Sequence, residues 1–201
     1  TVTLKNGSDV ASNSNGISVG ADGSISIINV NDTSTVKGGL TGIFAQSFVA
    51  GGDITVNTQA GTSVEGTADG AAGIGAFAQA AGNVKVDAQG IVSSGTNSTA
   101  IIVQTSTGTA EVKTGAGAIT GDVIGISAFS TGSTATVTTG AGEVKATKNA
   151  AIFAKSSVST VSVTTGTGAV TSTEGEGILA TSKTGATIDA HGDVSGIEGI
   201  S

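Results

Sequence analysis

Residues 125–150 read GISAFSTGSTATVTTGAGEVKATKNA and contain one complete unit of a repeat that runs through the chain. The unit opens on Gly125-Ile126, and Ala128, Ala135, Val137 and Val144 follow as its inward-facing apolar positions. Gly, Ser, Thr and Asn separate these positions. Apolar residues that alternate with a period of two are the signal of a β-strand. The stretch therefore predicts three short strands in each repeat, with a turn after each strand.

The opening pair recurs eight times as Gly-Ile or Ala-Ile, with spacings of 22 to 31 residues. The mean spacing is (199 − 16)/7, about 26 residues, which lies in the range typical of solenoid repeats. Its isoleucines are Ile17, Ile43, Ile74, Ile101, Ile126, Ile152, Ile178 and Ile200. We therefore expect each strand to stack on its equivalent one coil away, which pairs its backbone and aligns identical side chains.

The chain is predicted to be all-β and to form a right-handed three-faced parallel β-helix of about seven coils of about 26 residues each. Residues 1–201 form a single segment that starts and ends within a coil. The second strands contribute inward pairs such as Ile25/Ile27 and Val84/Val86. The third strands contribute one β-branched residue per coil: Val36, Val64, Ile91 or Val92, Ile119, Val144, Val170 and Val194. A left-handed β-helix, whose apolar residues recur every six positions, fits this period badly.

The composition excludes several classes of protein. The chain of 201 residues has 33 Gly and no Cys, Pro, Met, Trp or Tyr, and all 8 basic residues are Lys. Without Cys there is neither a disulfide scaffold nor thiolate chemistry. A net charge of −7 without Arg argues against nucleic acid as a partner. The apolar stretches fall far short of the ~18 residues of a membrane span, so we expect no membrane insertion by this segment. The many glycines are expected at corners, where positive φ is often required.

No motif points to catalysis, a cofactor or a metal ion, so we expect no catalytic, cofactor-binding or metal-ligating residue and no enzyme activity. His191, the single histidine, is expected in a solvated turn after the second strand of the last coil. The carboxylates lie in different columns or distant coils, unlike the clustered acids of a glycosidase. We expect cross-strand charge pairs between Lys85 and Glu111 and between Asp87 and Lys113. The triplet Gly51-Gly52-Asp53 faintly resembles a calcium repeat but does not recur.

The most informative anomaly lies on the first strand of each coil. If Ile and the Ala or Val two residues later point inward, the residue between them and the next one along point outward. Large apolar residues alternate between these two outward columns: Phe44, Phe77, Ile102, Phe129, Phe153 and Leu179. We call these six residues the apolar stripe and predict that they bind a partner, because contiguous exposed apolar patches mark interaction surfaces. Two alternatives remain, a stripe covered by another part of the protein or a neighbouring copy, and phenylalanines that point inward.

The repeat resembles those of bacterial autotransporter passengers (type V secretion). The resemblance rests on segments such as Gly42–Ala45, Asp53–Thr58 and Gly140–Lys145, which read GIFA, DITVNT and GAGEVK. It covers essentially the whole chain. It implies a β-helical fold, export through the periplasm to the surface of a Gram-negative bacterium, and adhesion or host interaction, as in virulence. The chain would then be a piece of a longer passenger.

On this reading the chain is a surface-exposed, non-catalytic adhesive segment. Its partner is a host-cell or bacterial surface protein or glycan, and self-association through the apolar stripe or the coil ends is an alternative. Two other functions stay open: a β-helix that binds or degrades a polysaccharide, and a plain spacer or filament-stacking unit. The repeat between Gly42 and Gly73 is longer than the others, and we expect its extra residues to form surface loops.

Overall fold

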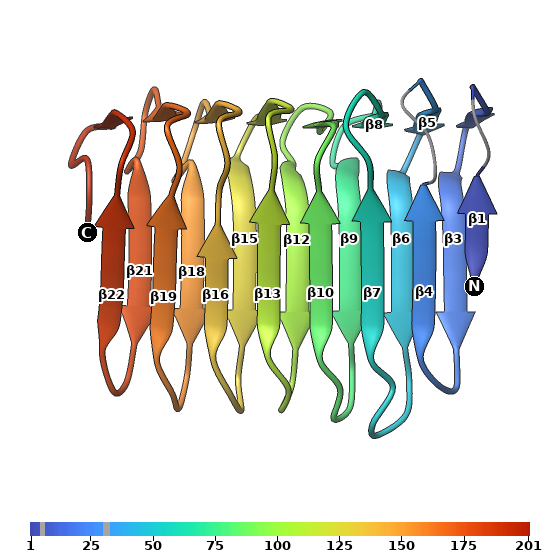
Figure 1. Cartoon of the computed structure of the whole chain (residues 1–201), viewed down its shortest axis with the longest axis horizontal. Coiled ribbons are helices and arrows are strands. Elements are labelled where there is room, and N and C mark those ends of the chain that lie inside the picture. The colour runs from blue at the N-terminus through green and yellow to red at the C-terminus, as the bar shows by residue number, and fades with distance from the viewer. Residues whose placement is uncertain (5–6, 30–32) are drawn as a thin grey trace.

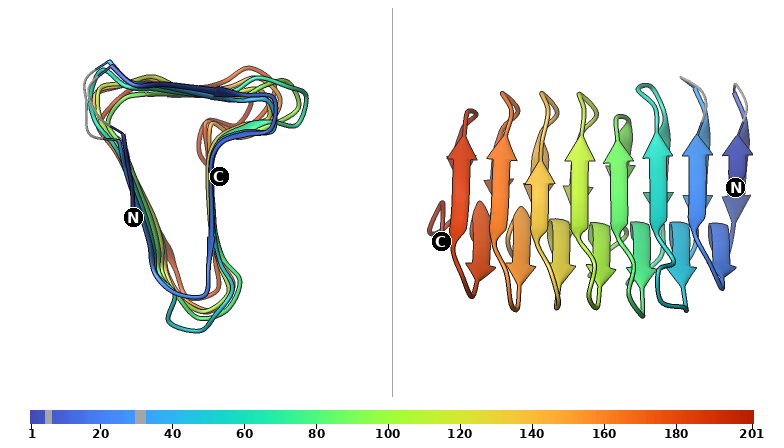
Figure 2. Two further views of the ribbon diagram at one scale, coloured as in Figure 1. Left: turned by 90° about the vertical axis from the view of Figure 1, so that its right-hand side faces the viewer. Right: turned by 60° about the horizontal axis from the view of Figure 1, so that its bottom comes forward.

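The protein folds as a parallel β-helix (Figure 1). Its structure is a computed structural model that describes residues 1–4, 7–29 and 33–201, and for residues 27–29 it describes the backbone alone. The described residues form 23 strands and no helix. Viewed along its axis, the chain traces a triangle whose three sides are three sheets (Figure 2).

Each sheet takes one strand from every coil. Sheet A contains β1 (Val2–Leu4), β4 (Ile25–Asn29), β7 (Ile54–Thr58), β10 (Val84–Ala88), β13 (Ala110–Thr114), β16 (Ala135–Thr138), β19 (Val161–Thr165) and β22 (Ala186–Ala190). Sheet B contains β2 (Asp9–Ser12), β5 (Thr35–Gly38), β8 (Ser63–Gly66), β11 (Ile91–Ser93), β14 (Ile119–Gly121), β17 (Val144–Ala146), β20 (Val170–Ser172) and β23 (Val194–Ser195). Sheet C contains β3 (Asn15–Ala21), β6 (Thr41–Ser47), β9 (Ala72–Ala78), β12 (Thr99–Thr105), β15 (Ile124–Ser130), β18 (Ile152–Ser156) and β21 (Ile178–Ser182).

Every strand pairs in parallel with its equivalents in the neighbouring coils, and the register matches the sequence repeat. In sheet C, Ile101 lies opposite Ile74 on one side and Ile126 on the other. Seen from the N-terminal end, the chain runs clockwise as it recedes, so the helix is right-handed (Figure 2, left). The predicted fold, its handedness and its coil length of about 26 residues are confirmed.

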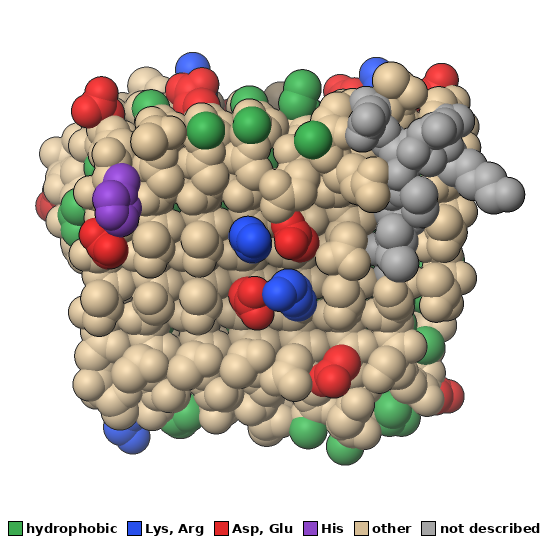
Figure 3. All heavy atoms as spheres, viewed as in Figure 1, with side chains coloured by type: hydrophobic (Ala, Val, Ile, Leu, Met, Phe, Trp, Pro, Cys, Tyr) green, Lys and Arg blue, Asp and Glu red, His purple; other side chains and the backbone are tan. Residues whose placement is uncertain are grey.

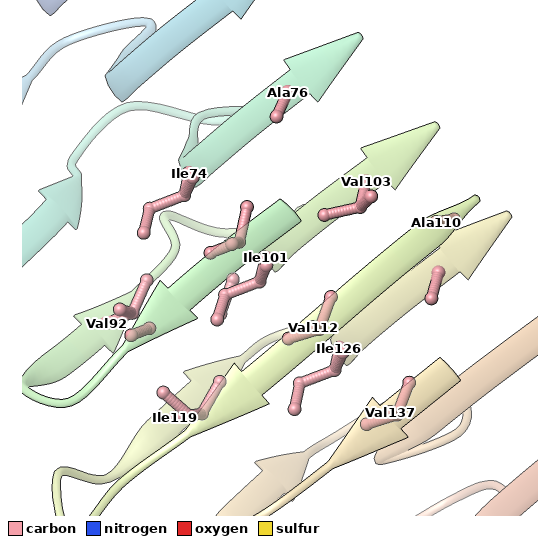
Figure 4. Packing of buried hydrophobic residues seen from close by; sticks show 14 of the residues in the cluster. Ile74, Ala76, Val92, Ile101, Val103, Ala110, Val112, Ile119, Ile126 and Val137 are labelled. Atoms are coloured by element: carbon pink, nitrogen blue, oxygen red, sulfur yellow. The ribbon is translucent and has the colours of Figure 1, made fainter. Parts of the chain in front are cut away.

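The core is a narrow column of stacked β-branched side chains. Ile43, Ile74, Ile101, Ile126, Ile152 and Ile178 are fully buried, and the inward residues of sheets A and B pack against them. Figure 4 shows Ile74, Ile101 and Ile126 on successive coils. The open choice between Ile91 and Val92 as the inward residue of β11 is resolved, because Val92 is fully buried and Ile91 is 50% exposed. The side chain of Ile27, also predicted to point inward, lies outside the described residues.

The expected positive φ is found at some glycines of the corner between sheets A and B, such as Gly7 and Gly61, but the stacked glycines of the central coils have another cause. Positive φ occurs at Gly7, Gly51, Gly61, Gly70, Gly185 and Gly199, and not at the stacked corner glycines of the central coils. A Cβ on Gly142 would lie 2.1 Å from the carbonyl oxygen of Gly117, and one on Gly168 would lie 2.1 Å from that of Gly142. These positions exclude side chains because successive coils approach each other closely there.

Buried hydroxyls fix the turn from sheet C to sheet A, which the sequence analysis did not predict. Thr105, Ser130 and Ser156 follow each other in register at the ends of their strands. The Ser130 hydroxyl donates to the carbonyl of Gly108 in the preceding coil (2.7 Å) and accepts from the N–H of Ser133 (2.9 Å). Ser156 makes the same two bonds one coil later, to Ser133 and from Ser159. Each hydroxyl therefore closes its own turn and ties that turn to the previous coil.

Truncation of one core isoleucine tests this account of the core. We expect Ile126→Ala to lower the free energy of unfolding by about 2–5 kcal/mol, because it opens a cavity at a fully buried site. Ile91→Ala on the outer face of sheet B is the matched control and is expected to change it by less than about 0.5 kcal/mol. Urea unfolding followed by circular dichroism measures both. Equal losses in the two variants would contradict the assignment of the inward face.

Alanine at a corner glycine tests the close approach of the coils. We expect Gly142→Ala to destabilise the protein by about 1–3 kcal/mol, because its Cβ would overlap the carbonyl oxygen of Gly117. Gly23 is the control, since a Cβ there would meet nothing within 4 Å. Gly23→Ala is expected to be neutral or to stabilise by up to about 1 kcal/mol. Thermal unfolding compares the two, and a neutral Gly142→Ala would show that the corner is loosely packed.

Candidate interaction surface

The six residues of the apolar stripe all lie on the outer face of sheet C. None belongs to the buried core, and each is half-buried. Strand register places Phe44, Ile102, Phe153 and Leu179 in one outward column and Phe77 and Phe129 in the adjacent one. The inward orientation of the phenylalanines, one of the alternatives considered above, is therefore not found. The stripe runs from β6 to β21, over six consecutive strands.

Phe77 lies along the sheet surface instead of projecting from it. A Cβ built on Gly75, two residues earlier, would lie 2.9 Å from Cε2 of Phe77 and 3.7 Å from Cδ2 of Phe44. The two rings are tilted by 38° with their centroids 5.7 Å apart, a favourable arrangement for an aromatic pair. Gly75 thus leaves the space into which both rings settle, which explains a glycine in the middle of a long strand.

Phe129 is covered in part by a lysine from the next coil. The Nζ atom of Lys155 lies over its ring, 5.7 Å from the centroid. Phe129 and Lys155 are register partners on β15 and β18, so the contact follows directly from coil stacking. A cation–π contact at such a partly exposed site contributes about 0.5–1 kcal/mol. The aliphatic stem of Lys155 therefore continues the apolar stripe and its ammonium group adds a positive charge.

Phe48 belongs to the same face, although it lies in the long repeat between Gly42 and Gly73, whose extra residues were expected only to form surface loops. It follows β6 in the long repeat and is 50% exposed. A Cβ on Gly20 of β3 would lie 3.3 Å from its Cε2 atom, so the ring reaches back over the preceding coil. An outward glycine is the sequence signal that could have placed Phe48 on this face, because Phe48 covers Gly20 as Phe77 covers Gly75. All five phenylalanines of the chain therefore lie on the outer side of sheet C or at its edge.

Sheet A presents a different surface, flat and largely made of uncharged polar side chains (Figure 3). Charged groups of both signs gather in its middle. The predicted pair Lys85–Glu111 is confirmed at 2.9 Å, and the Glu111 carboxylate raises the pKa of Lys85 by hydrogen bonding to it. Asp87 lies beside Lys113 in register, as expected, but its carboxylate accepts a hydrogen bond from Gln89. Of the two predicted charge pairs, only Lys85–Glu111 forms an ion pair among the described residues.

A ladder of polar loops ties four coils together at the corner between sheets B and C. The Asp69 carboxylate accepts hydrogen bonds from Thr96 (3.1 Å) and the Asn97 amide (2.8 Å). Asp122 accepts one from the Asn97 backbone N–H (2.7 Å) and one from Lys148 Nζ (2.8 Å). These bonds hold the pKa of both carboxyl groups below the ordinary value, through Asn97 for Asp69 and through Lys148 for Asp122. Asn97 sits at φ +54°, a conformation that Asn tolerates.

His191 follows β22, as the sequence predicts. Its Nδ1 atom lies 2.9 Å from the carbonyl oxygen of Thr165. Because a carbonyl can only accept, this nitrogen carries the proton. Nε2 lies 3.8 Å from the Asp189 carboxylate, and both side chains are more than half exposed. The histidine thus ties the last turn to the previous coil.

A shallow groove of about 320 Å³ lies at the corner between sheets A and B. Its lining is mostly small and apolar: Ala60, Gly61, Gln89, Gly90, Ile91, Ala116, Gly117 and Ala118. The corner glycines create this hollow by lacking side chains. Gln89, the one amide in the lining, is engaged with Asp87.

Within residues 1–4, 7–29 and 33–201, no three His, Asp or Glu side chains converge in a way that could hold a metal ion. The same residues include no helix that could cross a membrane. Comparisons of the chain with protein-family models, with curated proteins and with solved structures give no match. The outward apolar side chains on six consecutive strands therefore make the apolar stripe of sheet C the best-supported candidate interaction site.

The polar ladder predicts an acid-dependent stability. The hydrogen bond from Lys148 holds the folded-state pKa of Asp122 below its ordinary value, so its stabilising contribution is present above the ordinary carboxyl pKa and is lost as the pH falls through the folded pKa. We expect Asp122→Asn to lower the thermal midpoint at pH 7. The difference from the wild type should vanish in acid well below the ordinary carboxyl pKa. Glu174→Gln, in an exposed turn, is the control. A difference that persisted at low pH would assign the effect to packing.

Proposed function

We propose that the chain is a non-catalytic adhesive module, a rigid β-helical rod that presents the apolar stripe to a partner at the bacterial cell surface. The observation that carries the proposal is the continuous row of outward apolar side chains on six successive strands of sheet C. A rigid scaffold holds these side chains in fixed positions. Binding therefore costs little additional ordering of the surface.

The cellular setting of the proposal rests on the repeat sequence. Its Gly-Ile-x-Ala and Gly-x-Gly-x-Val segments resemble autotransporter passengers, which favours export through the periplasm and display on a Gram-negative cell. The absence of cysteine fits passage through an oxidising compartment without cross-linking. The parallel β-helix is a suitable architecture for such a rod, because its length grows by one strand spacing per coil.

The contacts of the titratable side chains support the non-catalytic part of the proposal. Glu111 and Asp122 are paired with lysines of neighbouring coils, and His191 is held by the Thr165 carbonyl. Catalytic sites instead bring several groups together around a reacting centre. These three side chains thus take part in contacts between neighbouring coils.

The double variant Phe77→Ser/Phe129→Ser tests the adhesive role. Beads coated with the chain are incubated with epithelial cells and with Gram-negative cells, and bound beads are counted. We expect saturable binding of the wild type and a loss of about tenfold or more in the double variant, since both rings are central to the stripe. Ile91→Ser, which removes an apolar side chain that is 50% exposed on sheet B, is expected to bind as the wild type does.

Circular dichroism and the thermal midpoint establish that each variant is folded. Because Phe77 covers Gly75, the variant Phe153→Ser/Leu179→Ser provides a second test at the other end of the stripe. Undiminished binding by both folded double variants would contradict the proposal.

A further inference from the structure

One outward column of sheet C alternates amides with rings. Strand register aligns Gln46, Phe77, Gln104, Phe129 and Lys155 on five consecutive strands, β6 to β18. Neighbouring strands are about 4.8 Å apart, so the two rings repeat at about 9.6 Å along the helix axis, with an amide between them. The column therefore offers an apolar surface and then a hydrogen-bonding group, in a fixed linear order.

The apolar part of this face is too narrow for a protein partner. The two outward columns are about 6.6 Å apart, and the stripe extends over five strand spacings, about 24 Å. Allowing for side-chain width, its footprint is on the order of 300 Å², whereas the apolar part of the area that each partner buries in a stable protein–protein interface is about 450 Å². A second copy of this chain would face the same shortage of area. A single extended polymer chain that lies along the helix axis fits the shape of the stripe.

The distribution of charge adds a chemical preference. On the described strands of sheet C neither outward column carries a carboxylate, and Lys155 is their one charged residue. Sheets A and B, by contrast, expose carboxylates and lysines together: Asp87 and Glu111 with Lys85 and Lys113 on sheet A, and Asp9 and Glu65 with Lys37 and Lys145 on sheet B. Sheet C is therefore the one face on which an acidic polymer would meet an outward lysine without a carboxylate in the same outward columns.

We infer that the outer face of sheet C binds a linear polysaccharide that carries carboxylate groups, with its chain parallel to the helix axis. Sugar faces stack on Phe77 and Phe129, the amides of Gln46 and Gln104 bond to hydroxyls between them, and the Lys155 ammonium pairs with a carboxylate. The inference rests on the proposed function, because it names the partner of the same face. The Lys155 ammonium is free to leave the Phe129 ring, since that contact is weak.

A fluorescent hexamer of galacturonic acid tests this inference by titration against the 201-residue chain. We expect saturable binding that weakens about tenfold in Phe77→Leu/Phe129→Leu, because leucine keeps the apolar cover over Gly75 but removes the flat rings. Lys155→Met keeps the stem over Phe129 and removes the charge. It is expected to weaken binding several-fold and to flatten its salt dependence. A neutral glucose hexamer is expected to bind more weakly than the acidic one.

Ile91→Leu on sheet B is the matched control, an apolar exchange away from the stripe that is expected to leave binding unchanged. No binding of the acidic hexamer, or equal binding by the wild type and the folded leucine variant, would overturn the inference. If the hexamer does not bind while the serine variants still lose cell adhesion, the inference fails and the proposed function stands. If adhesion survives in the serine variants, the proposed function itself fails.

Discussion

The parallel pairing of each strand with its equivalent one coil away is the interaction on which the rest of this structure depends. It satisfies the backbone groups of strands that are too short to be stable alone. It also places like residues on top of one another, so a single register fixes the isoleucine core, the stacked glycine corners and the buried hydroxyls. The same register brings distant residues such as Phe77 and Phe129 into one outward column.

The inward side chains are nearly the same in every coil, whereas the outward side chains differ from sheet to sheet. Inward positions admit only residues that stack, because the core is narrow and densely packed. Outward positions escape this constraint, and each face has its own character. Sheet A pairs charges across coils, the corner between sheets B and C links its loops through Asp122 and Asn97, and sheet C displays aromatic rings. The functional proposals above therefore rest on the outward columns, which the packing of the core does not constrain.

Much of this fold could be predicted because the sequence repeats with the same period as the coils. The Gly-Ile pairs gave the coil length, and alternation gave the inward and outward faces, including the stripe around Phe129. Contacts between coils were harder to foresee. The glycine at position 142 reflects the distance between two backbones, and the place of Phe48 over Gly20 depends on the path of a loop. A local sequence pattern encodes neither the distance between two coils nor the path of a loop. The outward Gly20 near Phe48 could nevertheless have indicated the contact between these two residues.

A distance between two spin labels tests the central claim, the stacking register, most directly. Thr55 and Thr187 occupy the same outward column of sheet A on β7 and β22, five strands apart. The chain has no cysteine, so cysteines introduced at these two positions carry the only labels. Double electron–electron resonance should give one narrow distribution near 24 Å, which is five strand spacings. A broad distribution, or one displaced by a whole strand spacing, would contradict the register and with it the outward columns of sheet C.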